Sequence, residues 1–194
     1  MTGMGDIGGF AALVFSAAIA ENIVLAKMLG LCPFAGLSRR LDVAVGVGMA
    51  TCAVLTLASV AAYYAGGLLA AAPLLRPMVF IAIAGSAVAA AELLMRLFAP
   101  VMHRALGLYL PLIATNCAVL GVMLLAAGDG ESEGGALAAL ARGFGGGLGF
   151  MLAVVIFALL RGRVVEVLVP PVMRGAPLAM ITAGWMALAF SALP

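Results

Sequence analysis

Long apolar stretches alternate with short polar connections along the whole 194-residue chain. A transmembrane helix needs about 20 mostly apolar residues, and six stretches approach or reach that length. Most charges and prolines fall in the connections, of which the longest polar one runs from 128 to 135. The pattern predicts six membrane-spanning helices and no soluble domain. The expected spans are 7–27, 43–65, 78–97, 106–127, 144–160 and 177–193.

Composition excludes most soluble classes of protein. Hydrophobic residues make up 66% of the chain and charged residues only 9%, against roughly 25% charged in soluble domains. The net charge of +2, carried by scattered Lys and Arg, also argues against binding to nucleic acid. We therefore expect an all-α protein with a single integral membrane domain covering 1–194, in direct contact with the lipid bilayer.

The distribution of positive charge predicts the orientation. Connections after the first, third and fifth spans carry most of the arginines, whereas the other side carries Arg76, Arg142 and the acidic insert. Cytoplasmic loops are enriched in Lys and Arg, so both termini are expected in the periplasm, with the chain in a bacterial inner membrane. The first ten residues contain no Lys or Arg, which favours a retained first span over a cleaved signal peptide. The arginines of the cytoplasmic side are Arg39, Arg40, Arg96, Arg104, Arg161, Arg163 and Arg174.

The two halves of the chain, about 1–98 and 99–194, share a weak pattern. Each half would hold three spans, an odd number, so the second half would lie inverted relative to the first. Inverted repeats are common in transport proteins, whose sites lie at the repeat interface on interrupted helices; small residues that simply allow close helix packing are the alternative. We expect helices 1 and 4 to be interrupted. The matching pairs are Cys32-x-x-x-Gly36 with Cys117-x-x-x-Gly121, and Gly46-x-Gly48 with Gly147-x-Gly149.

Two cysteines occupy equivalent places in these halves. Gly30 and Pro33 flank Cys32, and proline removes a backbone donor and disfavours helix for the residue before it. Irregular backbone at membrane depth is tolerated only where it is buried in protein or lines a cavity. Beside Cys117, Asn116 could satisfy freed backbone groups or donate a hydrogen bond to a sulfur ligand. The pattern predicts that both thiols face one another near the membrane midplane.

Soft thiolates in such a position suggest an iron–sulfur cluster or copper. A cluster usually takes four cysteines, so a second chain would supply the ligands that Cys32 and Cys117 do not. A disulfide between the two remains the competing interpretation. Cys52, in the middle of a span and without a counterpart in the repeat, is expected to be a small packed hydrophobe.

Ionisable residues at membrane depth suggest a different function. Such groups are costly and usually paired or functional; Glu21 and Lys27 could serve ion movement, whereas Glu92 and Arg96 are spaced for an interfacial pair. The alternative function is therefore a secondary transporter or ion channel subunit that uses the repeat interface without a redox cofactor. A scaffold subunit without a cofactor is a third possibility, and His103 is expected in a solvated loop.

The residues 21–34 and 110–121 resemble the first and fourth spans of a known family. The family is the A-type membrane subunit of the Rnf (Rsx) electron-transport complex, related to the E-type subunit of the same complex and to the D-type and E-type subunits of the sodium-pumping NADH:quinone reductase. The resemblance covers essentially the whole chain, and the two cysteine motifs are specific. One departure is Glu21, a carboxylate where the family pattern is neutral.

The resemblance implies a component of an ion-translocating ferredoxin:NAD oxidoreductase, with no catalysis by this chain alone. Cys32 and Cys117 would bind a [2Fe–2S] cluster together with two cysteines of a homologous inverted subunit, similar to the Rnf E-type subunit. The cluster would relay electrons between an iron–sulfur subunit on the cytoplasmic side and flavin subunits towards the periplasm. The residues expected to shape the helix breaks and screen the sulfurs are Gly30, Pro33, Asn116 and Gly121.

Overall fold

A computed structural model describes residues 3–20, 22, 29–30, 41–68, 73–98, 116–128, 135–164 and 170–191. Every regular element within these ranges is a helix, which confirms the all-helical prediction. The predicted site residues Glu21, Lys27, Cys32 and Pro33, like His103, lie outside the described residues.

Six α-helices are present in the described ranges, and each overlaps one predicted span. Helices α4 and α9 have 28 and 29 residues, and both are long and apolar enough to cross a membrane; at about 1.5 Å per residue they exceed the roughly 30 Å hydrocarbon core. The helices are α1 (Gly3–Phe15), which a π-helical turn (Ser16–Ala20) follows, α4 (Leu41–Leu68), α5 (Arg76–Phe98), α8 (Cys117–Gly128), α9 (Gly135–Arg163) and α10 (Ala176–Ser191).

The expected start of the fifth span was wrong. Helix α9 begins at Gly135 rather than at residue 144, so Arg142 lies inside the helix and not in a connection. The extra segment, Ala136 to Arg142, consists of alanine, leucine and arginine, which are the strongest helix formers. A segment that is apolar except for Arg142 and has high helix propensity therefore extends α9 towards the acidic insert.

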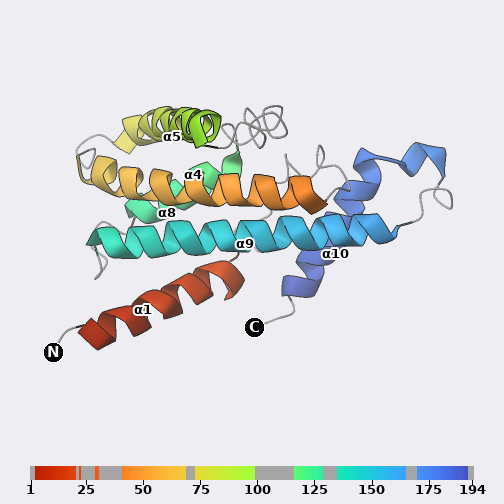
Figure 1. The fold of residues 1–194 in the computed structure, drawn as a ribbon, viewed down its shortest axis with the longest axis horizontal. Helices are drawn as coiled ribbons and strands as arrows, with labels where there is room; N and C mark the ends of the chain where they lie inside the picture. The colour runs from red at the N-terminus through yellow and green to blue at the C-terminus, as the bar shows by residue number, and fades with distance from the viewer. Residues whose placement is uncertain are drawn as a thin grey trace.

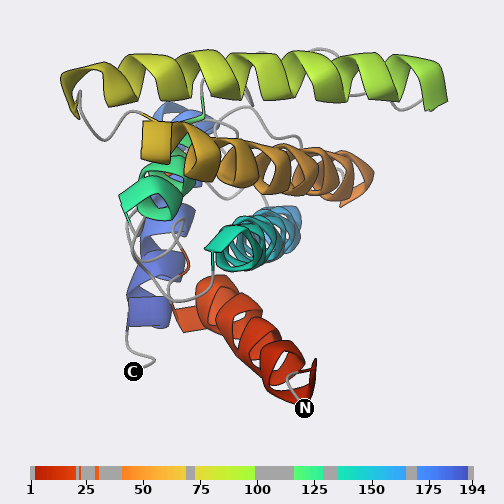
Figure 2. The same ribbon diagram turned by 90° about the vertical axis from the view of Figure 1, so that its left-hand side faces the viewer.

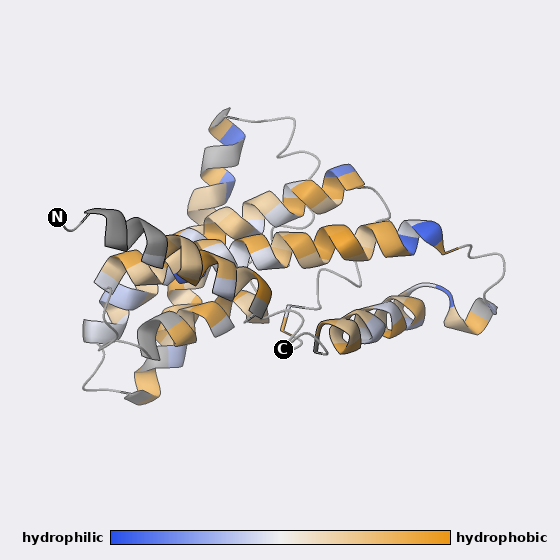
Figure 3. Ribbon diagram, turned by 90° about the horizontal axis from the view of Figure 1, so that it is seen from below, coloured by the Kyte–Doolittle hydropathy of each residue, from blue (hydrophilic) through white to orange (hydrophobic). Residues whose placement is uncertain are grey.

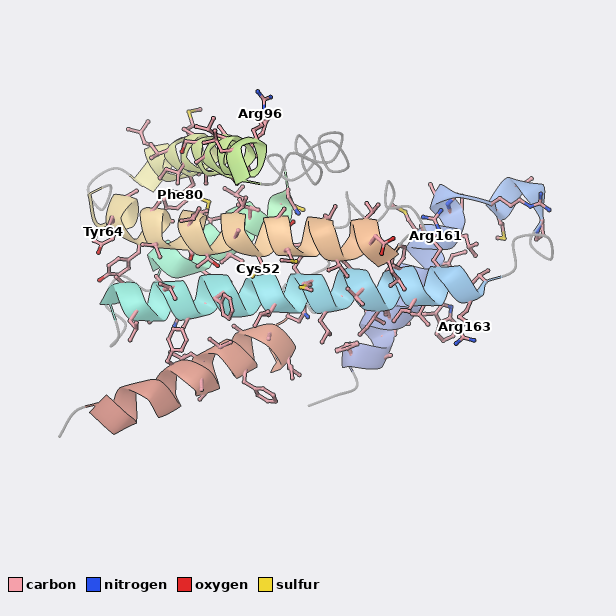
Figure 4. All side chains as sticks on the ribbon, in the orientation of Figure 1. Cys52, Tyr64, Phe80, Arg96, Arg161 and Arg163 are labelled. Carbon is pink, nitrogen blue, oxygen red and sulfur yellow. The ribbon has the colours of Figure 1, made fainter. Side chains whose placement is uncertain are left out.

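Helices α4 and α9 form the centre of the molecule and run antiparallel, side by side (Figure 1). Helices α5 and α8 pack on the α4 side and α1 on the α9 side, and α5 crosses the bundle at a steep angle (Figure 2). The beginning of α4 and the end of α9 lie at the same end of the pair. This end carries Arg161 and Arg163 (Figure 4) and is the most hydrophilic part of α9 (Figure 3).

Glycines bring α4 and α9 into close contact. A Cβ atom added at Gly48 would lie 2.7 Å from Cγ of Met151, and one added at Gly147 would lie 2.7 Å from Cα of Cys52. The two contacts are reciprocal, because each glycine faces the residue four positions beyond the other glycine. Small residues at membrane helix interfaces let backbones approach closely, and the glycines of this segment do so, as predicted.

A second glycine face of α9 receives the first helix. Added Cβ atoms at Gly145 and Gly149 would lie 2.7 and 2.8 Å from the carbonyl oxygens of Val14 and Ala18. The spacing Gly-x-x-x-Gly places both glycines on one side of α9. Helix α9 therefore packs with its backbone against α1 and the π-helical turn on one side and against α4 on the other.

Large apolar side chains lie on the outside as well as in the core. Phe80, Phe150 and Phe157 are fully buried, whereas Trp185 is 71% exposed and Met78 is 73% exposed. Large exposed apolar areas mark protein or membrane contact. The outer faces of α5 and α10 thus fit a chain surrounded by lipid and neighbouring subunits rather than by water.

The predicted pair on α5 is present, with Arg96 Nη2 donating to Glu92 Oε1 at 2.6 Å. The two side chains are 60% and 32% exposed, and exposed i,i+4 pairs contribute about 0.3–0.5 kcal/mol. We expect Glu92→Gln to lower the free energy of unfolding by no more than about 0.5 kcal/mol. Thermal unfolding of the purified variant measures the change, and a loss several times larger would show that the pair is part of a buried network.

Candidate functional site

The predicted site residue Cys117 is the first residue of α8, and Asn116 caps this helix. The Asn116 carbonyl accepts the N–H groups of Val119 at 3.0 Å and Leu120 at 3.5 Å. Its side-chain Oδ1 accepts the N–H of Ala118 at 3.0 Å, as asparagine does at the start of a helix. The Cys117 thiol is partly buried and not in a disulfide. It lies at the N-terminal end of α8.

The structure brings the first cysteine motif to this point. Gly30, two residues before Cys32 in sequence, donates its N–H to Sγ of Cys117 at 2.9 Å. The two residues are separated by 87 positions along the chain. Gly30 of the first motif thus contacts Cys117 of the second. That the two thiols face one another stays a prediction, because Cys32 lies outside the described residues.

Glycine is required at position 30 for two reasons. Its φ angle is +86°, in the left-handed region that residues with a Cβ atom rarely adopt. An added Cβ would also lie 3.0 Å from Cβ of Ala118, 3.1 Å from Oδ1 of Asn116 and 3.3 Å from Cε2 of Phe150. Gly30 therefore packs tightly against the beginning of α8, where its N–H reaches the sulfur of Cys117.

Asn22 fixes the other side of the first motif. Its side chain is 2% exposed, and its Nδ2 donates to the carbonyl oxygens of Ala18 and Gly149, both at 3.1 Å. Ala18 lies within the π-helical turn at 16–20. Turns of this type are frequent at functional sites. The amide group of Asn22 thereby ties the end of the first helix to the middle of α9.

We expect the substitution Asn22→Leu to destabilise the fold by about 1–3 kcal/mol, because it leaves two buried carbonyl oxygens without this donor. Leucine has a similar size, so the lost hydrogen bonds dominate. The thermal midpoint of the purified protein measures the loss. Thr182→Val is the control, because the Thr182 hydroxyl only donates to the carbonyl of Leu178 in its own helix; equal effects of the two substitutions would argue against the anchoring role.

The remaining predicted residues fall into two groups. Gly121 lies one turn along α8 from Cys117 and is partly buried, whereas Cys32, Pro33, Glu21 and Lys27 lie outside the described residues. Cys52 packs in the middle of the α4–α9 contact against Gly147 (Figure 4), as a small hydrophobe would, with its Sγ 3.9 Å from the Phe144 carbonyl.

Sequence reasoning gave no role to Asn22 or to Phe150. Asn22 stands inside the motif that carries the resemblance, so an asparagine at membrane depth was a signal that could have been used. Phe150 follows a run of glycines on α9 and offered no comparable signal. Its place against Gly30 comes only from the packing of α9 on the first motif.

The fold and this site define an integral membrane protein made of helices, with two sequence-distant motifs joined at a helix N-terminus. A family described as "Rnf-Nqr subunit, membrane protein" matches residues 10–194, and the chain belongs to this family.

The chain is also similar to proteins named as the A-type subunit of an ion-translocating oxidoreductase complex. The one from Cereibacter sphaeroides is 46% identical over 188 residues, covering 95% of both chains. Those from Actinobacillus pleuropneumoniae and Pseudomonas paraeruginosa are 45% and 46% identical, covering 92% and 93% of both chains. The resemblance drawn from the cysteine motifs is confirmed.

Proposed function

We propose that this chain is the A-type subunit of an ion-translocating ferredoxin:NAD oxidoreductase complex, where it relays electrons through a [2Fe–2S] cluster within the membrane. Cys32 and Cys117 supply two ligands, and a homologous subunit of opposite orientation supplies the other two. The names of the relatives support the assignment to such a complex. The chain has no catalytic activity of its own and depends on iron–sulfur and flavin subunits as electron partners.

The observation that carries the proposal is the hydrogen bond from Gly30 to the Cys117 sulfur. Cys32 follows Gly30 by two residues in sequence and lies outside the described residues. The contact of Gly30 with Cys117 supports the proposal that the two motifs share one site. This contact does not favour a disulfide over metal binding. A sulfur that accepts a backbone N–H is typical of iron–sulfur sites, where such hydrogen bonds adjust the reduction potential of the cluster.

The reciprocal contacts of α4 and α9 support an inverted repeat. A two-fold axis that exchanges the two helices would also exchange the Gly48–Met151 contact with the Gly147–Cys52 contact. These contacts relate the halves by 99 positions, two fewer than the 101 that relate Gly46-x-Gly48 to Gly147-x-Gly149. Helices α1 and α8 also correspond, because each is the first helix of its half and each is short, with 13 and 12 residues. We propose six spans in two inverted halves, with interruptions before α8 and after the π-helical turn.

The residues present fit a cluster of this kind. A [2Fe–2S] cluster, when bound, accepts and releases one electron at a time. Cys117 offers a free sulfur ligand at a helix N-terminus, Gly30 donates an N–H to its sulfur, and Asn116 holds the helix end in place. Phe150, fully buried beside Gly30, excludes water from this region.

The arginines at the end of α9 support an orientation with this end in the cytoplasm and both termini in the periplasm of a bacterial inner membrane. Arg161 and Arg163 lie at the same end of the central pair as the start of α4 (Figure 4). In sequence, Arg39 and Arg40 directly precede α4. Both connections at this end are therefore rich in positive charge.

Ion transport by the whole complex in proteoliposomes tests the proposed function. We expect ion uptake only when reduced ferredoxin and NAD are both supplied, and none after Cys32→Ala and Cys117→Ala are introduced. Uptake by this chain alone, without electron donors and independent of both cysteines, would instead identify a secondary transporter or channel subunit. Normal electron transfer by the double variant would indicate a scaffold without a cofactor.

A further inference from the structure

The side-chain amide of Asn116 has a fixed orientation. Its Oδ1 accepts the N–H of Ala118 at 3.0 Å, and only an oxygen can accept this hydrogen. Exchanging the oxygen and nitrogen of the amide would set two donors against each other. The Nδ2 group therefore points away from the helix end that Oδ1 caps.

This Nδ2 group is buried and has no hydrogen-bond partner among the described residues. Asn116 is only 2% exposed, and a buried donor left unsatisfied costs about 1–3 kcal/mol. The three other polar residues that are buried as whole residues in the described ranges each donate a hydrogen bond: Asn22 to Gly149, Thr51 to Val47 and Ser59 to Thr56. The unmatched donor of Asn116 thus indicates that an acceptor belongs beside it.

The surroundings of Asn116 identify the kind of acceptor. Cys117 follows it directly, and Gly30 lies against both, with its N–H on the Cys117 sulfur. Ala118 and Phe150, which with Asn116 surround Gly30, contribute carbon atoms and no acceptor there. Among groups that could be placed here, the sulfur atoms of a cluster bound through Cys117 supply acceptors without needing water.

We propose that Asn116 is a positioning residue whose Nδ2–H donates a hydrogen bond to a sulfur atom of the cluster bound at Cys117 and raises its reduction potential. The inference rests on the proposed function. Reduction adds negative charge to the cluster sulfurs, so a donor stabilises the reduced state more than the oxidised state. The N–H of Gly30, which belongs to the other cysteine motif, donates to the Cys117 sulfur and should likewise raise the reduction potential.

The substitution Asn116→Ser in the assembled complex separates this role from helix capping. Serine caps a helix about as well as asparagine but lacks the amide donor. We expect the ratio of reduced to oxidised cluster at a fixed potential to fall about tenfold, which for a one-electron couple is a shift of about 59 mV to lower potential. Potentiometric electron paramagnetic resonance measures this shift, and an exchangeable-proton coupling to the cluster should weaken with it.

Two further variants make the outcome decisive. Thr51→Val is the control, an equally buried polar residue whose hydroxyl already donates to the Val47 carbonyl in its own helix, and it should leave the midpoint potential unchanged. If Asn116→Ser does not assemble, Asn116→Asp decides, because it keeps a capping oxygen, removes the donor and should lower the potential further. An unchanged or higher potential in an assembled Asn116 variant overturns the inference, whereas a wild-type complex without this cluster overturns the proposed function itself.

Discussion

Cys117→Ala is expected to stop electron transfer through the complex while leaving the complex assembled. The alanine fits at the first position of α8 and keeps the Asn116 cap, but it removes one of the proposed cluster ligands and the acceptor of the Gly30 N–H. Changes in residues that only support a metal site typically cost 10–100-fold in activity. Loss of a ligand should exceed this, so we expect a decrease of more than about 100-fold in ferredoxin-dependent NAD reduction.

The chain offers a matched control in Cys52. This cysteine is also partly buried in a helix, but it packs against Gly147 in the α4–α9 contact. Cys52→Ala should retain most of the rate, and both variants should copurify with the partner subunits in wild-type amounts. Equal rates for Cys117→Ala and Cys52→Ala would remove the basis for an electron relay at the beginning of α8.

Gly147→Ala is expected to destabilise the protein by about 1–3 kcal/mol, the usual cost of overpacking a tight interface. The added Cβ would lie 2.7 Å from Cα of Cys52. This neighbour is backbone and cannot rotate away, so α4 and α9 would have to separate. Separation would also disturb the Gly149 contact with Ala18 and Asn22 on the opposite face.

Gly146→Ala is the control for this substitution in the same helix. At Gly146 an added Cβ meets only the end of the Val122 side chain, at 3.4 Å. Since alanine is favoured over glycine in helices by about 0.5–1 kcal/mol, the control should be neutral or slightly stabilising. Thermal midpoints of the two purified variants give the comparison; equal midpoints would show that α4 and α9 are not in close contact in the membrane.

The helical class and the places of the helices could be predicted, because long apolar stretches leave few alternatives in a bilayer. The beginning of α9 was placed too late, because Arg142 was assigned to a connection although Ala136 to Ala141 is apolar and strongly helix-forming. The spacing of the glycines in α9 also does not predict which helix each glycine contacts. The sequence shows the glycines at 143–149, but only the packing shows that Gly147 faces α4 while Gly145 and Gly149 face the first helix.

The candidate site was predictable where backbone chemistry is local. Glycine and proline around Cys32 predicted irregular backbone, and Asn116 was expected to satisfy freed backbone groups or to donate to a sulfur ligand. The structure shows its Oδ1 accepting the backbone N–H of Ala118 at the start of α8. Contacts between distant segments carry no such local signal. The bond from Gly30 to Cys117, the anchor made by Asn22 and the position of Phe150 all depend on how α9 is placed between the two motifs.

The most direct test is the iron content and the electron paramagnetic resonance spectrum of the reduced complex, measured for the wild type and for the Cys32→Ala, Cys117→Ala double variant. If the two thiols hold a shared [2Fe–2S] cluster, the variant should contain about two iron atoms fewer per complex and lack one signal of this cluster type. Identical iron contents and identical spectra in equally assembled complexes would contradict the account.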